Sequence, residues 1–587
     1  MRALRVGLGT RTVLAFAATA LTGSGAAWAQ TAPGGAPPGT IPPSAAATGL
    51  SAPELNPAAR VPRLQPRDTD IFQPEPPGPC PLADSDVSVT LGAVTFRGST
   101  ALKAEDFGPT YREFIGKPQK VGVICQIRDR AAQTLFDRGI LARVEIPEQR
   151  IAGGALILDV IEAHVVNVRV RGDIGPAQAA VERYVEKLRG MKPFDMKKAQ
   201  RYLLLASDIP GVRVRAAIKP SVSPERGAVD IDVTVSRTAF SAVGNAQNMG
   251  SKTVGRWGGL VRGDARSFTP LGEDTTLVAF HTLDSNEQWV VQLQEAARIG
   301  ADGLMVHASA VYGESRPGDV LKPLDLKTTS AVGNVELSYP LIRRRRLNLN
   351  IAGGLDVINQ ETDQGEGQVG GGALTKDNVR VAYLRADGDM RAYGFDRNFL
   401  LDGSLTLRKG LTGLGATRQG ADLATREFAA PDAFLVRATA GVSAPVAGPI
   451  SASLRAQAQY SDKALTPYEQ ISLGDLSVGR GYDPAVVLGD TGAAAALDLR
   501  YAFVQLYPQI LASPFVFYDQ GFVHNNEAGL SGLTPSRTLR SFGAGVTLRL
   551  ANRANLELTY AKPIDAVTAG GPRPAGRLLV NLTASFF

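Results

Sequence analysis

The chain has 587 residues, a mean hydropathy of -0.03 and a formal net charge of +7. This length exceeds that of one ordinary domain, and the positive excess is too diffuse to indicate a nucleic-acid-binding protein. A near-neutral hydropathy does not exclude a membrane protein, because the strands of a transmembrane barrel alternate apolar and polar residues.

The N-terminus has the composition of an export signal. Arg2, Arg5 and Arg11 precede the apolar run VLAFAATALTG, and AWAQ offers a small-x-small cleavage site after Ala29. The apolar run is too short to span a membrane. The sequence therefore predicts a cleaved secretory signal peptide over residues 1–29, with an uncleaved anchor as the alternative.

A segment rich in proline, glycine and alanine follows, over residues 30–80. Such a composition cannot bury a core and predicts an extended or disordered linker. The chain has only two cysteines, Cys80 and Cys125. In an exported protein they predict a disulfide rather than a metal or redox site, and two separate buried thiols are the alternative.

Motifs of catalysis and cofactor binding do not emerge from the sequence. The four histidines lack ligand-like spacing, so no metal site is expected. A nucleophile elbow, a P-loop and a dinucleotide fingerprint are likewise missing from the sequence. We therefore expect neither an enzyme nor a cofactor.

The next part of the chain predicts an α/β module. A strand pair is expected at 87–98, and helical spacing extends over 101–118 and 124–139. Alternating strands follow at 142–149 and 155–163. The second helix is expected to turn its apolar residues to one face, namely Ile127, Ala131, Leu135 and Phe136.

The same order of elements then repeats. A strand at 165–172 precedes helices at 176–190 and 195–207, and strands follow at 212–220 and 228–236. The sequence thus predicts two β-α-α-β-β modules in series, each of about 75 residues.

From Phe240 onward, alternation punctuated by turns replaces helical spacing, which is the pattern of an all-β structure. Over 450–461, apolar side chains at even positions oppose Ser, Arg and Gln at odd positions, and 541–550 and 555–561 alternate likewise. In a soluble sandwich the apolar face points inward, whereas in an outer-membrane barrel it meets lipid and the polar face lines a wet interior.

The connections between these strands favour the barrel. Short connections such as 445–449 alternate with long ones such as 361–377 and 410–431, although the turn at 267–274 is long for its place. The expected strands number sixteen, an even count, and the last one ends on the aromatic Phe587. They begin near residues 240, 256, 275, 288, 303, 328, 345, 379, 398, 433, 450, 493, 514, 537, 554 and 577.

These features resemble the two-partner secretion transporters of the haemolysin secretion/activation type (TpsB; ShlB/FhaC/HecB). The stretches VTFRGSTAL and IPEQRI followed by GALILDVIE are similar to the first POTRA domain of that family, although Ala163 stands where the family usually has glycine. The resemblance implies POTRA domains at 81–163 and 164–238. It implies a sixteen-stranded antiparallel transmembrane β-barrel at 239–587, so the fold class is mainly β with an α+β periplasmic part.

An arginine between two glycines also resembles a motif of this family. In LSVGRGYDPAVVLGD, Arg480, Gly481 and Tyr482 are similar to a Val-Arg-Gly-Tyr/Phe motif at the tip of the long loop after strand eleven of the family's barrel. Gly479 is an insertion relative to that pattern. The resemblance implies that this loop lies in the barrel lumen.

The partner motif of that loop, Phe-x-Asp-x-Gly on strand thirteen, is matched by Phe517, Asp519 and Gly521. Strand alternation independently places these three on one face. We therefore expect Arg480 to form a salt bridge with Asp519 inside the barrel, because an arginine fork suits a carboxylate in a partly dry site. The alternative is a solvated arginine and a lumen aspartate that never meet.

The resemblance implies a transporter in the outer membrane of a Gram-negative bacterium, with its POTRA domains in the periplasm. Its expected partner is an unfolded exoprotein that the POTRA domains recognise and the barrel secretes. Outer-membrane lipid is a further expected partner, as is the barrel-assembly machinery that reads the C-terminal strand. An insertase that assembles other barrel proteins is the alternative, and a passive porin, which leaves 87–236 without a role, is a further one.

Overall fold

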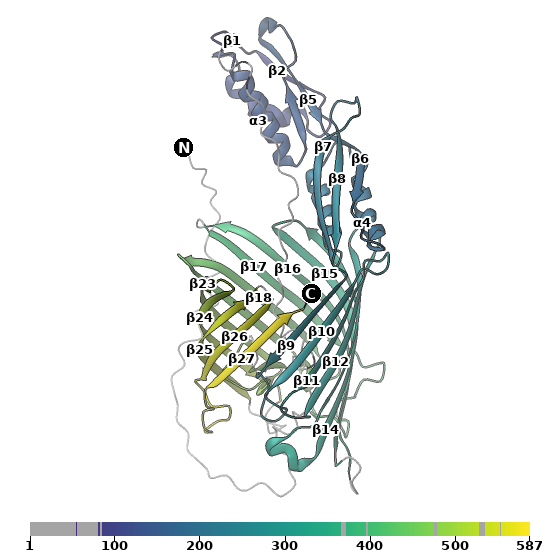
Figure 1. Cartoon of the computed structure of the whole chain (residues 1–587), viewed down its shortest axis with the longest axis vertical. Coiled ribbons are helices and arrows are strands. Elements are labelled where there is room, and N and C mark those ends of the chain that lie inside the picture. The colour runs from purple at the N-terminus through teal and green to yellow at the C-terminus, as the bar shows by residue number, and fades with distance from the viewer. Residues whose placement is uncertain are drawn as a thin grey trace. The chain divides into compact units, whose positions relative to one another are not determined.

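Two small α/β domains precede a closed barrel whose wall runs from teal strands to yellow ones (Figure 1). The expected fold class is confirmed. The expected signal peptide, most of the expected linker and Phe587 lie outside the described residues. The computed structural model describes residues 85–365, 371–394, 397–474, 478–527, 535–551 and 553–586, together with Leu55, Cys80 and Leu82.

The first domain packs one long helix on a three-stranded sheet. Its elements are β1 (Ser88–Thr90), β2 (Ala93–Arg97), 3₁₀ helix η2 (Ala104–Phe107), α2 (Gly108–Tyr111), η3 (Arg112–Phe114), β3 (Pro118–Lys120), α3 (Val123–Arg138), β4 (Ala142–Glu145), η4 (Ala152–Gly154) and β5 (Ala155–Glu162). The sheet has the order β2-β5-β4, with β2 parallel and β4 antiparallel to β5. Ile127 and Leu135 of α3 share a buried core with Leu156 and Leu158 of β5.

The structure corrects two details of this domain. The helix expected over 101–118 is wrong in extent, because only the short pieces η2, α2 and η3 form there. Pro109 lacks the N–H that a helix continuing from η2 needs. Phe136 is 37 % exposed rather than on the buried face of α3, since it follows Leu135 by one residue and is turned about 100° around the helix.

The second domain has the same topology. Its elements are β6 (His164–Arg171), α4 (Ala177–Val185), η5 (Glu186–Leu188), α5 (Met196–Ser207), β7 (Val212–Pro220) and β8 (Ala228–Arg237). The sheet order is β6-β8-β7, again with the first strand parallel and the second antiparallel to the last. Tyr184, Leu203 and Ile231 lie in the core that the helices and the sheet bury together.

The structure joins Cys80 to Cys125 of α3 in a disulfide, with the Cα atoms 5.8 Å apart and 45 positions between the two residues in the chain. Cys125 is buried in the first domain. The bond therefore ties the end of the segment that precedes this domain to its long helix.

Removing the bond in a Cys80→Ser/Cys125→Ser variant is expected to destabilise the first domain by roughly 2–4 kcal/mol, because the bond closes a long loop of the unfolded chain. Limited proteolysis in urea should show this domain cleaved at lower denaturant than in the parent. Heat-modifiable migration on gels should show the barrel unchanged. Equal protease resistance of the two proteins would contradict the prediction.

Sixteen long antiparallel strands close the barrel within the described residues. They are β9 (Phe240–Gln247), β10 (Gly258–Arg266), β11 (Asp274–Thr282), β12 (Gln288–Ile299), β13 (Leu304–Ser315), β14 (Leu326–Arg343), β15 (Leu347–Gln364), β16 (Gly372–Gly394), β17 (Arg397–Gly410), β18 (Phe434–Ala447), β19 (Ile450–Ser461), β22 (Thr491–Tyr501), β24 (Ile510–His524), β25 (Ser536–Leu550), β26 (Ala554–Pro563) and β27 (Arg577–Ser585). A short strand, β23 (Val504–Tyr507), pairs with β24, and a 3₁₀ helix, η6 (Asp319–Leu324), precedes β14. β27 closes on β9, and these two strands lie side by side in Figure 1.

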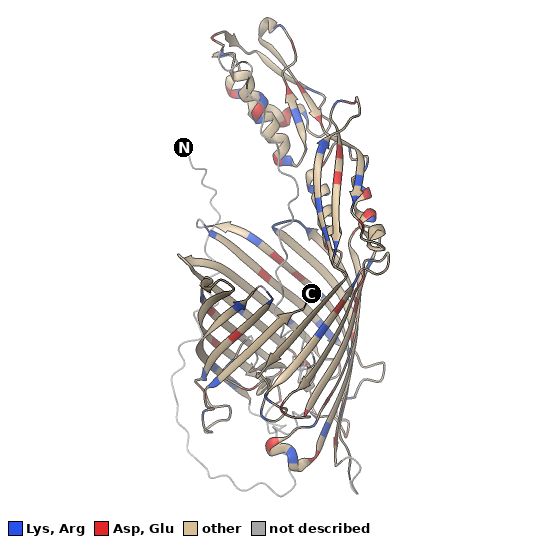
Figure 2. Ribbon diagram, in the orientation of Figure 1, with Lys and Arg blue, Asp and Glu red and all other residues tan. Residues whose placement is uncertain are grey.

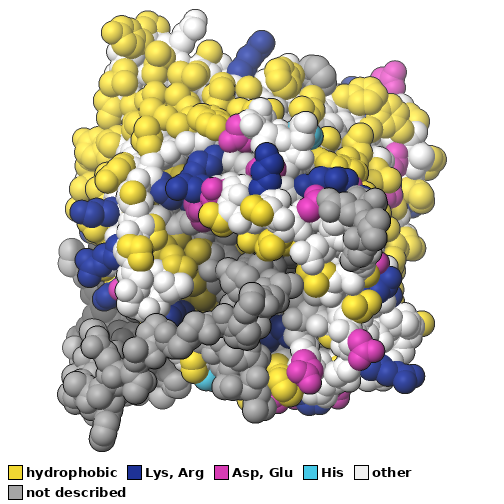
Figure 3. Space-filling view, turned by 90° about the horizontal axis from the view of Figure 1, so that it is seen from below, with side chains coloured by type: hydrophobic (Ala, Val, Ile, Leu, Met, Phe, Trp, Pro, Cys, Tyr) yellow, Lys and Arg dark blue, Asp and Glu magenta, His cyan; other side chains and the backbone are white. Residues whose placement is uncertain are grey.

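Alternation along each strand separates the two faces of the wall. In β24, Phe517 and Asp519 are buried, whereas Val516 and Tyr518 are 52 % and 41 % exposed. In Figure 3, hydrophobic side chains gather along the upper margin of the face shown, and charged ones lie nearer its middle. The wall thus has an apolar outside and a polar inside, as a barrel in lipid requires. None of the helices in the described ranges is long and apolar enough to cross a membrane.

Two connections differ from the expected pattern. The loop expected over 361–377 is mostly strand, because β15 extends to Gln364 and β16 already begins at Gly372. A cross-strand ion pair of 2.8 Å joins Lys376 and Glu361 in this extension. The long turn at 267–274 contacts the second domain, where the Ser267 hydroxyl donates to the Pro210 carbonyl at 2.8 Å.

The described residues fall within one compact unit, 43–587. In it, Arg343 donates hydrogen bonds of 2.7 and 2.6 Å to the Asp208 carboxylate, which follows α5. Leu55, within the expected linker, is 3 % exposed and packs in one cluster with Leu260 and Phe280 of the barrel wall. Composition predicted an extended or disordered linker there, but a leucine still gains free energy by covering an apolar surface.

Candidate functional site

Residues 462–490, the inward loop, connect β19 to β22, and their described parts, 462–474 and 478–490, pack against the inside of the barrel wall. The loop carries η7 (Pro467–Glu469) and two short strands, β20 (Ile471–Leu473) and β21 (Val487–Gly489), which pair antiparallel with each other. Leu473, Val478 and Tyr482 of the loop form one buried cluster with Ala496, Val523 and Leu539 of the wall. Apolar contact on this scale holds the loop inside the barrel rather than in solution.

The structure brings Arg480 and Asp519 together. The Arg480 side chain donates to the two Asp519 oxygens, from Nη2 at 2.7 Å and from Nε at 3.1 Å. Its Nη1 donates to Asp498 of β22 at 2.8 Å, and its guanidinium carbon lies 3.6 Å from the centre of the Phe517 ring. The guanidinium is thus held by two carboxylates and stacked on one aromatic ring, an arrangement that a lysine cannot reproduce.

The Asp519 carboxylate is fully buried and accepts more than the arginine. The backbone N–H groups of Gly479 and Arg480 donate to it at 3.1 and 3.0 Å, and the Ser541 hydroxyl donates at 3.1 Å. A buried charge is stable only when its hydrogen bonds are satisfied. Asp519 therefore binds the backbone of the loop tip as well as the charged side chain of its arginine.

The two glycines beside Arg480 act differently. Gly479 has φ of +87°, a conformation that favours glycine. Gly481 lacks a positive φ, but a Cβ there would lie 2.9 Å from Ser541 Cβ and from the Pro563 nitrogen. Gly479 therefore allows the backbone to turn beside the arginine, whereas Gly481 permits close approach to the wall.

Tyr482 and Gly521, the remaining motif residues, also lie at this contact. The Tyr482 hydroxyl donates to the Arg540 carbonyl at 2.8 Å and accepts from the Asp565 N–H at 3.0 Å, so Tyr482 joins the loop tip to two further segments. Gly521 leaves room for Leu473 of β20, whose methyl carbon would lie 2.3 Å from an added Cβ.

A second buried ion pair fastens the loop on the other side. Glu469 of η7 is 3 % exposed and accepts from Arg408 of β17 at 2.9 and 3.0 Å. Arg408 also lies 2.8 Å from Asp356 of β15, and Arg437 of β18 donates to the Glu469 carbonyl at 2.7 Å. The inward loop is thus tied by charge to both β17 and β24.

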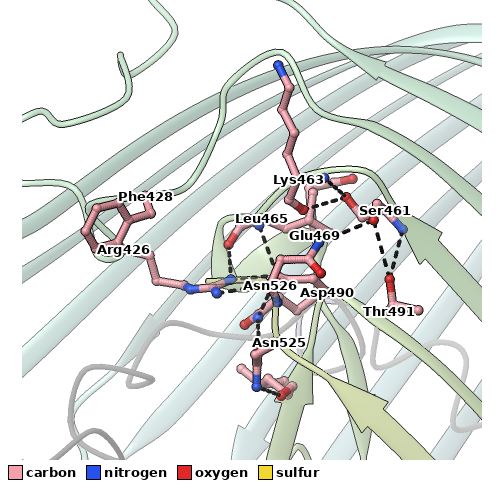
Figure 4. A network of polar contacts seen from close by, with 12 residues as sticks. Arg426, Phe428, Ser461, Lys463, Leu465, Glu469, Asp490, Thr491, Asn525 and Asn526 are labelled. Atoms are coloured by element: carbon pink, nitrogen blue, oxygen red, sulfur yellow. Dashed lines mark hydrogen bonds and ion pairs between the residues drawn. The ribbon is translucent and has the colours of Figure 1, made fainter. Parts of the chain in front are cut away.

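A third polar cluster gathers the long loops at their base (Figure 4). Asp490, which is 0 % exposed, accepts from Arg426 at 2.6 and 3.1 Å and from the Leu465 N–H at 2.9 Å. It also accepts from Gln470 at 3.0 Å and from the Asn526 N–H at 2.8 Å. One carboxylate therefore joins the connections at 411–433, 462–490 and 525–535.

Asp490→Ala is expected to release the 411–433 connection, because it leaves the Arg426 guanidinium without its carboxylate partner and two backbone N–H groups without their acceptor. Such a loss costs about 3–5 kcal/mol for a buried pair. Trypsin added to intact cells should then cleave after Arg426 in the variant and not in the parent.

Asp432→Ala is the matched control, since Asp432 joins the same two loops through Lys463 at 2.8 Å but both side chains are over 40 % exposed. An exposed pair contributes about 0–1 kcal/mol, so this variant should remain resistant. Equal resistance of the Asp490→Ala variant would show that the cluster does not hold the loops.

Sequence reasoning missed Asp490, Arg426, Glu469 and Arg408. Strand alternation places Arg408 on the inner face of β17, but the other three lie in connections that have no period. Their burial arises only when the closed barrel brings the loops together. Among the described residues, no group of His, Cys, Asp and Glu is arranged to hold a metal ion. The arrangement can hold a loop in the lumen through charge pairs.

Comparison with known families gives two matches. The model of the haemolysin secretion/activation proteins ShlB/FhaC/HecB matches residues 227–549, more than half of the chain. The model of the ShlB-type POTRA domain matches residues 89–163, the first α/β domain.

Individual proteins are similar at low identity. The heme/hemopexin transporter protein HuxB of Haemophilus influenzae (strain 86-028NP) is 20 % identical over 80 % of this chain and 82 % of its own length. The structure of CdiB from Escherichia coli superposes with a TM-score of 0.69 at 16 % identity, over 88 % of this chain and 93 % of CdiB. CdiB from Acinetobacter baumannii gives 0.63 at 16 % identity, over 91 % and 97 %. At these identities the structural matches establish the fold alone.

Proposed function

Because the chain belongs to the haemolysin secretion/activation family ShlB/FhaC/HecB, whose members are transporters of two-partner secretion, we propose that it captures an unfolded exoprotein with its POTRA domains and passes it through its barrel. The barrel lies in the outer membrane, and the POTRA domains lie in the periplasm. The two α/β domains are called POTRA 1 and POTRA 2 from here on. The family works with a secreted exoprotein, and its members form a transporter class rather than an enzyme class.

The observation that carries the capture step is the edge of the POTRA 2 sheet. In the sheet order β6-β8-β7, β7 pairs with β8 on one side, and among the described residues no strand pairs with its other side. An extended segment of the exoprotein can add there through main-chain hydrogen bonds. Such bonding tolerates many sequences, which suits a transporter that must hold every part of a long chain in turn.

The passage step requires the lumen to open. Buried ion pairs hold the inward loop, at Arg480–Asp519 and at Arg408–Glu469. A buried pair gains little over the fully hydrated ions, so water and cargo entering the lumen can replace it at modest cost. We propose that the inward loop leaves the wall while cargo passes, and that folding of the cargo outside the cell supplies the driving force.

Photo-crosslinking of a stalled cargo tests the capture step. A photo-reactive residue is placed at Ala217, which is exposed on β7, and the chain is produced together with a candidate exoprotein. The cargo carries a rapidly folding C-terminal domain that arrests its passage. We expect a crosslink from Ala217 to the arrested cargo, and none from Lys198, which is exposed on α5 on the helical side of the domain.

Equal crosslinking from both positions would show that the edge of β7 is not the capture site. If the exoprotein reaches the surface equally well without this chain, while the levels of other barrel proteins fall, the chain is an insertase rather than a secretion channel. Unimpeded efflux of small solutes without any exoprotein dependence would instead favour a passive porin.

Two further partners are proposed for the barrel itself. Its outer face, with exposed apolar side chains such as Leu277, Val291 and Tyr312, has the chemistry of a surface that contacts lipid. The barrel-assembly machinery is proposed to insert the chain through its C-terminal strand, β27, and the terminal Phe587 that follows it.

A further inference from the structure

The outer face of the POTRA 2 sheet, the side away from its helices, carries a cluster of positive side chains. Figure 2 shows blue bands on the two flanking strands and red bands on the central strand between them. We name this cluster the cationic face, and its members are Arg169 and Arg171 of β6 and Arg213, Arg215 and Lys219 of β7.

Among the described residues of this sheet, the acidic side chains on the same face are Asp230 and Asp232 of the central strand β8, and both already have partners. Arg169 lies 3.1 Å from Asp230, and Asp232 lies 2.9 Å from Lys219 and 3.6 Å from Arg171. The Lys219 hydrogen bond holds the pKa of Asp232 below its usual range, and the Ser221 hydroxyl does the same for Asp230. Both carboxylates are therefore ionised at neutral pH and already paired with cationic side chains.

Arg213 and Arg215 are different, because no hydrogen bond or ion pair joins the side chain of either one to another described residue. Both side chains are exposed, and their partners across the ladder on β8 are the uncharged Ser236 and Thr234. Arg215 lines a shallow groove of about 240 Å³ together with Arg171, Ala216, Ala217, Lys219, Asp232 and Thr234. This half of the cationic face thus presents two free guanidinium groups beside hydroxyls.

We propose that this face selects exoprotein segments with acidic residues at alternate positions, which add as a strand to the edge of β7 with their carboxylates toward Arg213 and Arg215. The inference rests on the proposed capture of cargo at this edge, and it names the class of segment that binds there.

The geometry of a sheet sets the pattern. Side chains on one face recur every second residue, about 7 Å apart, and Arg213 and Arg215 have that spacing. An added strand lies about 4.8 Å from β7, so its own alternate side chains come opposite the arginines. Two positions further along β7 stands Ala217, which is neutral. The pattern is therefore two acidic residues two positions apart, with an uncharged residue at the next alternate position, on the side that lies opposite Ala217.

Binding of peptides to the full chain in uncharged phosphatidylcholine nanodiscs tests the proposal. Three fluorescein-labelled peptides of nine residues alternate threonine with glutamate, glutamine or lysine. A fourth keeps the glutamates and replaces the threonines with proline, which lacks the main-chain N–H groups that strand addition needs. Fluorescence anisotropy reports the dissociation constants.

The glutamate–threonine peptide is expected to bind roughly five- to tenfold more tightly than the glutamine peptide at low salt, a modest factor because exposed charge pairs are individually weak. The preference should shrink as salt is raised. The proline peptide should bind no better than the glutamine peptide.

Arg213→Glu/Arg215→Glu is expected to reverse the order, so that the lysine peptide binds more tightly than the glutamate peptide. That gain also shows that the variant is folded. Lys192→Glu/Lys198→Glu changes the net charge by the same amount at two exposed positions of the helical side, and it should leave the order unchanged.

Equal affinity for the three threonine peptides overturns the proposal, as does an unchanged order in the Arg213→Glu/Arg215→Glu variant. Tight binding of the proline peptide would make the surface a charge site rather than a strand site. Binding to phosphatidylglycerol vesicles that Arg213→Glu/Arg215→Glu abolishes, without any preference among the peptides, would assign the face to anionic lipid. If charge preference fails while arrested cargo still crosslinks to Ala217, the proposed capture stands and only its selectivity falls.

Discussion

Replacing Arg480 or Asp519 with alanine is expected to reduce secretion of the exoprotein at least about tenfold, with the barrel still present in the outer membrane. Either change leaves a buried charge without its partner, which costs about 3–5 kcal/mol. At an effective dielectric of about 20, opposite charges ~4 Å apart attract by roughly 4 kcal/mol before desolvation is subtracted. The loss is far larger than thermal energy, so the loop tip should lose its fixed place on the wall even without cargo and lie across the path that the cargo takes.

The measurement is the amount of exoprotein in the medium relative to the amount of barrel in purified outer membranes. The double variant Arg480→Ala/Asp519→Ala should be no worse than either single change, because residues that act as one unit are not additive. Arg480→Lys should resemble Arg480→Ala, because lysine keeps the charge but cannot bridge Asp519 and Asp498 with a planar fork.

Arg455→Ala is the matched control. Arg455 also pairs with Asp498, at 3.4 Å, but its side chain is 57 % exposed, so its loss should leave secretion near the parent level.

Exchange of the charges, Arg480→Asp with Asp519→Arg, should not restore secretion. An arginine at 519 cannot accept from the N–H groups of Gly479 and residue 480, and an aspartate at 480 would face Asp498. Normal secretion by both single alanine variants would show that the inward loop has no role in transport.

Deletion of residues 164–236, which removes POTRA 2, is expected to abolish secretion while the barrel still inserts. The deletion removes the free edge of β7 and the cationic face, and with them the proposed capture site. Barrel insertion should persist, because in the part of the chain that the structure describes the wall strands pair only with one another. Outer-membrane fractionation with heat-modifiable migration checks insertion, and exoprotein in the medium checks secretion.

This deletion also removes the contact between Asp208 and Arg343. Asp208→Ala/Arg343→Ala separates the two causes, since it breaks that ion pair and keeps the sheet edge. The double variant should retain most of the secretion that the deletion loses. Secretion at normal levels without residues 164–236 would count decisively against capture by POTRA 2.

The sequence by itself determined the architecture, because the signals for it are local. Alternation along β19 or β25 depends on the two-residue period of a strand, and helical spacing in α3 depends on one turn of helix. Each expected barrel strand therefore corresponds to an observed one. The expectation failed at Pro109, where the local signal of a proline opposes the helical spacing, and at the ends of β15 and β16, where the local signal was weak.

Part of the site could also be predicted from the sequence. The family motifs and the alternation in β24 indicated that Arg480 and Asp519 form a pair, and the structure places them in contact. Neither signal indicated that Asp519 also accepts from the backbone N–H groups of Gly479 and Arg480, or that Asp498 shares the guanidinium. Those contacts depend on how the loop tip meets three neighbouring strands at once.

Tertiary structure alone decided the remaining attachments. Asp490 draws its donors from connections that begin near residues 411, 462 and 525, and Glu469 meets Arg408 across 61 positions of chain. Loops have no period from which a partner can be read, and their side chains become neighbours only when the sheet closes on itself between β27 and β9. The physical reason is that burial of a loop carboxylate depends on the curvature of the whole wall, whereas the face of a strand residue depends only on its position in the strand.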